Sequence, residues 1–172
     1  MDVGTGDGKA VLRWALAELD RLVIGVDANA AGMRAAARRS SDLPNAAFVV
    51  AAAESLPDDL AAAADRVTVQ FPWGSLLRGI LCGEGPVLAN LARIAAPGAT
   101  LSVLWSVTDR DRAALGPVPT RPAEESFVAA GFEVRDLRPA TVGEIDATGS
   151  SWAKRLRAGV DRPAVLLSAV RR

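Results

Sequence analysis

The first residues of the chain have the types and spacing of a loop that binds a nucleotide-like cofactor. The opening DVGTGDG places glycines at positions 4, 6 and 8 behind Asp2, with Thr5 between the first two. Glycine has no Cβ, so the backbone there can turn tightly and approach a ligand closely. About 20 residues beyond this loop, Asp27 ends the apolar run VIGVD, where a carboxylate can accept hydrogen bonds from ribose hydroxyls. Together these residues indicate a site for an adenosine-containing cofactor.

The glycine spacing distinguishes between the cofactors that such a loop can hold. Dinucleotide-binding loops carry G-x-G-x-x-G, whereas Gly4, Gly6 and Gly8 form a G-x-G-x-G pattern. This spacing favours S-adenosylmethionine, whose ammonium group can bind Asp2 directly or through water. Plainer interpretations stay open, because the loop can be a simple turn and Asp27 can cap the helix that follows it.

A third element of the same site follows the apolar run at 47–51. Ala53 and Glu54 come shortly after that predicted strand, where the fold places the adenine ring and small alanines leave room for the base. An alternative is a helix start, with Ser55 and Pro57 as its entry signals. Both interpretations can hold together, so Ala53 and Glu54 are candidate cofactor contacts.

The segment FPWGSLLRG at 71–79 follows the fourth predicted strand, at the place of a substrate-binding motif. Common amino-methyltransferases carry N/D-P-P-Y/F/W there, and the first side chain of that motif holds an exocyclic amine. Phe71 cannot accept a hydrogen bond, so the predicted nucleophile needs no acceptor. Adenine N1 is such an atom, since its lone pair is free and it has no proton to lose before attack. Catalysis then consists of stacking, alignment with the methyl group and electrostatics.

The composition excludes several kinds of chemistry. The chain has no histidine and one cysteine, Cys82, which excludes histidine-based acid–base catalysis and an intramolecular disulfide and argues against a metal site such as zinc. No apolar run is long enough to span a bilayer and no secretory signal is visible, so we expect a cytoplasmic protein without a membrane partner. The formal net charge is zero, but residues from 149 onward carry six basic side chains and one acidic one. This surplus hints at a polyanion-binding surface, and a solvated basic end explains it about as well.

Short β-rich runs alternate with helical stretches along the 172 residues, which suggests a single domain over 1–172. The alternation predicts an α/β fold, Rossmann-like, with the mainly parallel seven-stranded sheet of class I S-adenosylmethionine-dependent methyltransferases. Further strands are expected at 21–26, 47–51, 66–71, 100–107, 132–137 and 164–170, and helices at 10–19, 30–39 and 87–95, the last ended by Ala96-Pro97-Gly98. Only three residues precede the glycine loop, so the first strand is truncated, and either upstream residues or another segment must complete the sheet.

Several motifs of the chain resemble one family. VGTGDGK, VIGVDA, LPNAAFVVAAAESLP, VTVQFPWGSLLRG and SSWAKRL are together similar to the Kam-type aminoglycoside-resistance 16S rRNA methyltransferases, over nearly the whole chain. That family methylates N1 of an adenine in the decoding-site helix of the small ribosomal subunit and confers resistance to kanamycin, apramycin and related drugs. The resemblance implies S-adenosylmethionine as the cofactor and 16S rRNA within the small subunit as the partner. We expect a monomeric enzyme.

The resemblance also implies roles for individual residues. Trp73 and Trp152 match a tryptophan pair that sandwiches the flipped adenine, and Ser150 matches a residue that orders the loop carrying the second tryptophan. Stacking on aromatic rings recovers part of the cost of flipping a base, about 1–3 kcal/mol per base. RNA contacts are expected at Pro72, Lys154, Arg155 and Arg162. Cofactor contacts are expected at Asp2, Gly4, Thr5, Gly6, Asp27, Ala53, Glu54 and Phe71. Without the family, Trp152 would be interpreted as a core tryptophan or a helix staple.

The chain departs from the family in several places, among them a short loop at 109–122 after the fifth strand, and leaves two other functions open. A β-hairpin extension before the glycine motif is absent, and Val160 stands where other members carry an arginine. One alternative is an enzyme of the same fold that methylates a small molecule, which zero net charge and the absent hairpin favour. The other is a paralogue that binds the cofactor or RNA with little or no rRNA activity, against which the intact aspartates and tryptophans argue.

Overall fold

The computed structural model describes residues 1–159 and 161–172 and, at Arg110, the backbone alone; Val160, one of the departures from the family, lies outside the described residues. Within these ranges, seven strands form one sheet in the order β3-β2-β1-β4-β5-β7-β6. The strands are β1 (Asp2–Val3), β2 (Val23–Asp27), β3 (Ala46–Val50), β4 (Ala64–Gln70), β5 (Ala95–Trp105), β6 (Phe132–Pro139) and β7 (Val165–Arg171). Neighbours from β3 to β5 pair in parallel, and β7 is antiparallel to β5 and β6. This mostly parallel sheet confirms the predicted Rossmann-like α/β fold.

The first strand is as short as the sequence predicts, and it still occupies the centre of the sheet. Asp2 pairs with Gly25 of β2 on one side and with Thr68 of β4 on the other. The carbonyl of Met1 extends this pairing, because it accepts a hydrogen bond from the amide of Thr68 at 2.9 Å. A two-residue strand therefore joins the two parts of the sheet and leads directly into the glycine loop.

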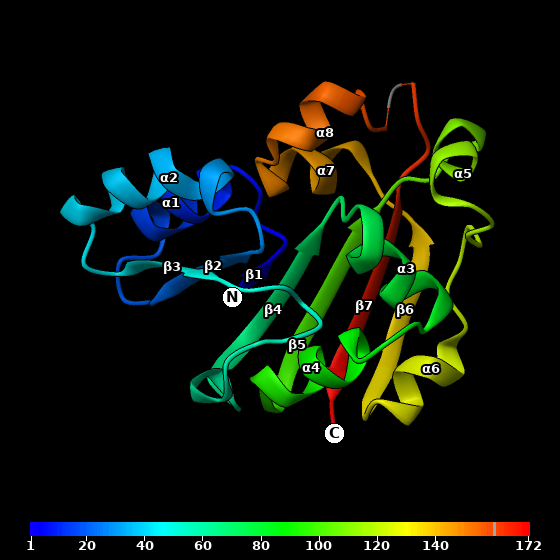
Figure 1. Cartoon of the computed structure of the whole chain (residues 1–172), viewed down its shortest axis with the longest axis horizontal. Coiled ribbons are helices and arrows are strands. Elements are labelled where there is room, and N and C mark those ends of the chain that lie inside the picture. Colours follow the sequence, from blue (N-terminus) through cyan, green and yellow to red (C-terminus); the bar gives the residue numbers. More distant parts are fainter. Residues whose placement is uncertain (160) are drawn as a thin grey trace.

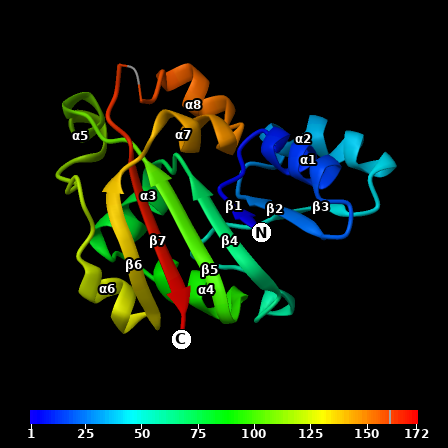
Figure 2. The same cartoon turned by 180° about the vertical axis from the view of Figure 1, so that it is seen from behind.

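Helices cover both faces of the sheet and its upper end (Figure 1). They are α1 (Lys9–Ala17), α2 (Ala30–Arg39), α3 (Gly74–Cys82), α4 (Val87–Ile94), α5 (Asp109–Leu115), α6 (Glu124–Ala129), α7 (Val142–Thr148) and α8 (Ser151–Leu156), with two short 3-10 helices at Ser40–Asp42 and Asp58–Leu60. Helices α1 and α2 pack on β2 and β3, whereas α3, α4 and α6 lie in front of the sheet in Figure 1 and behind it in Figure 2. Helices α5, α7 and α8 gather beyond the ends toward which β4 and β5 point. Among the described residues, none of these helices is long and apolar enough to cross a bilayer.

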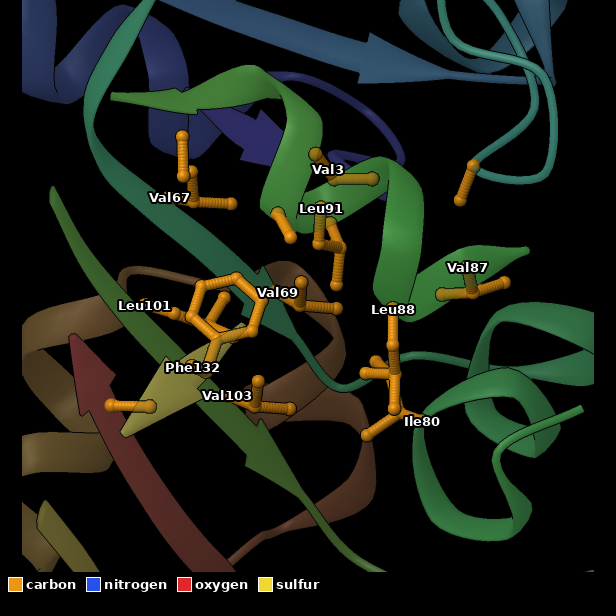
Figure 3. Close-up of a cluster of buried hydrophobic side chains, with 14 of the residues drawn as sticks. Val3, Val67, Val69, Ile80, Val87, Leu88, Leu91, Leu101, Val103 and Phe132 are labelled. Atoms are coloured by element: carbon orange, nitrogen blue, oxygen red, sulfur yellow. The ribbon is translucent and has the colours of Figure 1, made fainter. Parts of the chain in front are cut away.

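The main core lies between the central strands and helices α3 and α4 (Figure 3). Val67 and Val69 of β4 and Leu101 and Val103 of β5 alternate along their strands, so their side chains point to the same face of the sheet. All four are fully buried, and each such burial contributes roughly 1.5–3 kcal/mol to stability. This packing holds β4 and the start of α3 in place, and the connection between them carries the FPWG motif.

Two features differ from the sequence-based prediction. The helix expected at 87–95 ends at Ile94, and Ala95 begins β5, so Ala96-Pro97-Gly98 belongs to the strand and does not form a break after a helix. The Pro-Gly pair is accommodated because the pairing of β4 with β5 is irregular at this end. Helices α3, α5, α6, α7 and α8 are not among the helices predicted from the sequence.

Candidate functional site

A cavity of about 380 Å³ opens where the parallel strands end. Its walls come from the connections that follow β1, β2, β3 and β4, the end of an open α/β sheet at which such folds bind ligands. Six of the predicted cofactor contacts line it: Gly4, Gly6, Asp27, Ala53, Glu54 and Phe71. Residues that are far apart in the sequence therefore meet around one space.

The glycine loop has a geometry that only glycine accommodates well. Gly4, Gly6 and Gly8 all have positive φ angles, at 78°, 62° and 70°. A Cβ at Gly4 would lie 2.6 Å from a methyl group of Leu76, whereas a Cβ at Gly6 would lie 3.7 Å from the indole nitrogen of Trp152. The loop thus passes close to the start of α3 on one side and to α8 on the other.

The carboxylate of Asp27 fixes the glycine loop to the end of β2. Its Oδ2 accepts a hydrogen bond from the amide of Gly6 at 2.7 Å, and its Oδ1 accepts one from the amide of Asn29 at 2.8 Å. Helix α2 is capped by Asn29, whose side chain accepts from the amide of Gly32, so the alternative in which Asp27 caps this helix is wrong. Each oxygen of Asp27 keeps a second lone pair, which a ribose hydroxyl can use.

Asp2 lies deeper than the other candidate residues. It is 2% exposed, and its Oδ1 accepts a hydrogen bond from the hydroxyl of Thr68 at 2.7 Å. Burial raises the pKa of this carboxyl from 3.8 to about 6, although the bond from Thr68 opposes the rise. Asp2 and Thr5 line a smaller cavity of about 20 Å³, which shares Gly4 and Trp152 with the larger one. The structure thus places these two predicted contacts beside the main cavity and not in its wall.

Three buried oxygens near these cavities have no hydrogen-bond partner among the described residues. They are Oγ1 of Thr5, Oε1 of Glu54 and Oε1 of Gln70. A buried acceptor without a partner costs about 1–3 kcal/mol, so these atoms suit a ligand that brings donors. S-adenosylmethionine has ammonium, hydroxyl and amino donors, and the residues present therefore fit it. Gln70 directly precedes the FPWG motif, but no sequence pattern marks it as part of the site.

Trp73 and Trp152 line the main cavity and also a second one of about 190 Å³. They are 54% and 49% exposed, which is unusual for so large an apolar side chain and contradicts a core role for Trp152. Phe71, which precedes Pro72, has a φ of 48° in the left-handed region, where a non-glycine residue is strained. This strained turn starts the connection that carries Trp73 to the mouth of both cavities.

Helix α8 presents the second tryptophan. Ser150 caps the helix, since its hydroxyl accepts from the amides of Trp152 at 3.2 Å and Ala153 at 3.4 Å. The guanidinium of Arg155 lies 5.6 Å from the centre of the Trp152 ring, within the range of a cation–π interaction. Lys154 lines a separate hollow of about 200 Å³ between α7 and α8. Ser150 therefore lies where it can position Trp152, and both basic residues lie on the helix that carries it.

Arg162 is placed differently from an exposed phosphate ligand. It lines the second cavity and forms an ion pair with Asp111, and the two side chains are 18% and 8% exposed. Asp111 also accepts hydrogen bonds from the amide and hydroxyl of Thr108 in the capping box of α5. Asp111 is not among the predicted site residues, and the spacing T-x-x-D at 108–111 is the signal that could have indicated the cap. A phosphate that binds Arg162 would have to share it with this carboxylate.

Comparisons with known proteins identify the family. The family model described as NpmA, 16S rRNA (adenine(1408)-N(1))-methyltransferase, matches residues 1–171. This chain belongs to that family. A 16S rRNA (adenine(1408)-N(1))-methyltransferase of Streptoalloteichus tenebrarius is 33% identical over 181 residues, which cover 96% of this chain and 83% of the relative. The crystal structure of a mutant 16S rRNA (adenine(1408)-N(1))-methyltransferase from Catenulisporales acidiphilia with cosubstrate SAM matches with a TM-score of 0.87 and 33% identity, covering 99% of this chain and 84% of that one.

The resemblance to Kam-type enzymes is confirmed by a further structure. The 16S rRNA methyltransferase KamB matches with a TM-score of 0.86 and 30% identity, over 99% of this chain and 86% of that one. The chain is therefore an rRNA methyltransferase of the 16S rRNA (adenine(1408)-N(1))-methyltransferase family. Among the described residues, no group of three or more His, Cys, Asp or Glu side chains is arranged to hold a metal ion.

Proposed function

We propose that this family member methylates N1 of an adenine in the decoding-site helix of 16S rRNA, with S-adenosylmethionine as methyl donor, and thereby gives resistance to kanamycin- and apramycin-type aminoglycosides. The observation that carries the proposal is the position of Trp73 and Trp152. Both line the mouth of the cavity formed by the glycine loop and Asp27, and both are about half exposed. The glycine loop and Asp27, which form the cofactor half of the proposed site, and the two tryptophans, which form the base half, therefore line the same cavity.

The cofactor half would hold S-adenosylmethionine through complementary polar groups. Asp27 offers free lone pairs to the ribose hydroxyls, Ala53 and Glu54 border the space for the adenine ring, and Asp2 lies on the side of the ammonium group. When bound, the cofactor supplies an electrophilic methyl group. Phe71 and Pro72 line the cavity with apolar side chains, which would limit the access of water to this group.

The base half would act by alignment and not by proton transfer. Adenine N1 attacks with a free lone pair, so no side chain has to remove a proton first, which agrees with the absence of histidine and with Phe71 at the first position of the motif. The target base must leave its helix to reach the cavity, and stacking on Trp73 and Trp152 offsets part of that cost. Lys154 and Arg155 lie beside the second tryptophan, where they can bind the phosphates that flank the flipped base.

Methyl transfer to purified small ribosomal subunits tests this proposal. The wild-type protein is incubated with subunits from a sensitive bacterium and tritiated S-adenosylmethionine, and the modified nucleotide is located by its stop to reverse transcription. We expect one stop at a decoding-site adenine, and growth on kanamycin and apramycin when the protein is expressed in the same bacterium. Label on small metabolites without any dependence on subunits would instead support the small-molecule enzyme.

Two substitutions test the role of the tryptophans. Trp73→Ala and Trp152→Ala should bind S-adenosylmethionine with near wild-type affinity in calorimetry and lose roughly 10- to 100-fold in methylation rate, the equivalent of one stacked base. Leu19→Ala serves as the control, because Leu19 is 72% exposed and lies outside the site. Full activity on subunits in either tryptophan variant would refute the base sandwich.

A further inference from the structure

The corner between α7 and α8 is attached to the glycine loop by a contact that spans 144 residues of sequence. The hydroxyl of Ser151 donates a hydrogen bond to Oδ2 of Asp7 at 2.8 Å. Asp7 belongs to the glycine loop itself, and its carboxylate is also held by Lys9, whose amide donates at 3.2 Å and whose ammonium lies at 3.0 Å. The contacts with Lys9 therefore hold the Asp7 carboxylate that accepts the hydrogen bond from Ser151.

A second contact reaches the same corner from helix α1. The guanidinium of Arg13 donates to the carbonyl of Ala147 at 2.6 Å. Gly149, which ends α7 with a φ of 62°, packs so closely on this guanidinium that a Cβ there would lie 1.9 Å from it. Arg13 follows the glycine loop by one helical turn, so both contacts join the same cofactor-binding unit to residues 147–151.

These contacts bear directly on Trp152, the next residue after Ser151. Helix α8 has only six residues, too few for a helix to be stable by itself, so tertiary contacts decide its position. One side of α8 is anchored by Ala153, which is 5% exposed in a small apolar cluster, while Trp152 is about half exposed. The polar contacts from the glycine loop and α1 therefore supply much of what orients the tryptophan over Gly6.

We infer that Asp7 and Arg13 are positioning residues that clamp the α7–α8 corner onto the glycine loop, and so couple the cofactor half of the site to the base platform formed by Trp152. Neither residue lines the main cavity, and Asp7 lines the smaller one beside Asp2; both act through Ser151 and residues 147–149 and not on the reacting atoms. The clamp places the indole of Trp152 against the loop that would hold the methyl donor. The part of this inference that concerns catalysis rests on the proposed function; the part that concerns the position of α8 does not.

Ser151 provides a clean test, because its hydroxyl can be removed or kept. Ser151→Ala deletes the donor, Ser151→Thr retains it, and Asp7→Ala deletes the acceptor. Ser41→Ala is the matched control, since the hydroxyl of Ser41 donates to the carbonyl of Arg38 at the end of α2, far along the chain from the site. Amide hydrogen exchange of peptides covering 147–156 is measured in each protein without cofactor, and kcat, KM and cofactor affinity are measured with small subunits.

We expect Ser151→Ala and Asp7→Ala to raise exchange in 147–156 by about tenfold, the value of one hydrogen bond to a charged group. In Ser151→Ala the kcat should fall by a similar factor while the dissociation constant for S-adenosylmethionine changes less than twofold, and Ser151→Thr should restore both exchange and kcat. The double variant Asp7→Ala/Ser151→Ala should be no worse than either single variant. Arg13→Ala should raise exchange in the same peptides.

The inference is overturned if Ser151→Ala leaves exchange in 147–156 unchanged, or if the two single effects add fully in the double variant. It is also overturned if Ser151→Thr behaves like Ser151→Ala, because the hydroxyl would then be irrelevant. A wild-type protein that does not methylate small subunits would refute the proposed function alone, since the exchange measurement reports on the clamp without any turnover.

Discussion

The buried carboxylate of Asp2 should lower the stability of the folded protein at neutral pH, and Asp2→Asn should remove that loss. Burial is the main cause of its raised pKa of about 6; the bond from Thr68 and the charge of the Met1 ammonium oppose it, and Asp27 adds to it. The folded protein therefore holds this proton up to a higher pH than the unfolded chain, whose pKa is near 3.8. Stability from this group is fully present below pH 3.8 and is lost as the pH rises through 6. A shift of about two pKa units corresponds to about 3 kcal/mol.

Urea unfolding of the wild type and Asp2→Asn at pH 4 and at pH 7 measures this loss. We expect the free energy of unfolding of the variant, relative to wild type, to be about 2.5 kcal/mol higher at pH 7 than at pH 4, slightly less than the full value because the unfolded carboxyl is already partly ionised at pH 4. Asp7, Asp65 and Glu144 have lowered pKa values, but they titrate in both proteins, so their contribution cancels in the comparison. An equal stability difference at both pH values would refute the argument that burial of the charge is what destabilises.

The same variant separates stability from cofactor binding. If Asp2 accepts from the ammonium of S-adenosylmethionine, the ligand offsets the burial of the charge and lowers the pKa of the carboxyl in the complex. Asp2→Asn should then bind the cofactor roughly 10- to 100-fold more weakly at pH 7, the equivalent of a hydrogen bond between charged groups, while unfolding at higher urea concentration. Unchanged affinity in calorimetry would remove Asp2 from the cofactor site.

Two other substitutions have consequences that follow from the geometry. Gly4→Ala should destabilise the protein by about 1–2 kcal/mol in thermal unfolding and weaken cofactor binding, because φ at Gly4 is 78° and the new Cβ would meet Leu76. Gly143→Ala is the control, because Gly143 lies in helix α7 with open space where a Cβ would go. It should be neutral or stabilising in the same measurement. Asp111→Ala should destabilise by about 3 kcal/mol, because it leaves Arg162 without its carboxylate, and adding Arg162→Met should recover part of that loss in urea unfolding. A double variant no more stable than Asp111→Ala would show that the capping of α5, and not the ion pair, is what the carboxylate provides.

The parts of the fold that the sequence predicts are those set by local pattern. Runs such as VIGVD become strands because they are apolar and β-branched, and they are separated by stretches of helical spacing. The start of β5 was not predictable in this way. Ala96-Pro97-Gly98 has the composition of a helix stop, and it becomes strand only because β4 pairs with the backbone around it. Tertiary pairing overrides local propensity at that position.

The candidate site likewise contains some residues that local sequence patterns predict and others that only tertiary contacts bring together. Gly4, Gly6 and Asp27 are recognisable because each occupies a fixed position relative to a strand end, and the fold brings strand ends together. Asp111 and Arg162 are 51 residues apart, and nothing near either residue in the sequence indicates that they form an ion pair. The hydrogen bond between Asp7 and Ser151 could not be predicted from the sequence either, because it joins residues that are 144 positions apart.

The two halves of the site are held by different kinds of interaction, and this difference suits the proposed reaction. The cofactor half rests on close packing at Gly4 and on hydrogen bonds that backbone amides donate to the carboxylate of Asp27. The base half has two half-exposed tryptophans, one of which lies on a six-residue helix held by the buried Ala153 and by polar contacts to the glycine loop and α1. An enzyme that takes a base out of an RNA helix must keep the methyl donor fixed while its base platform adjusts to the arriving nucleotide. In the proposed reaction, the hydrogen bond from Ser151 to Asp7 would connect this base platform to the fixed cofactor half.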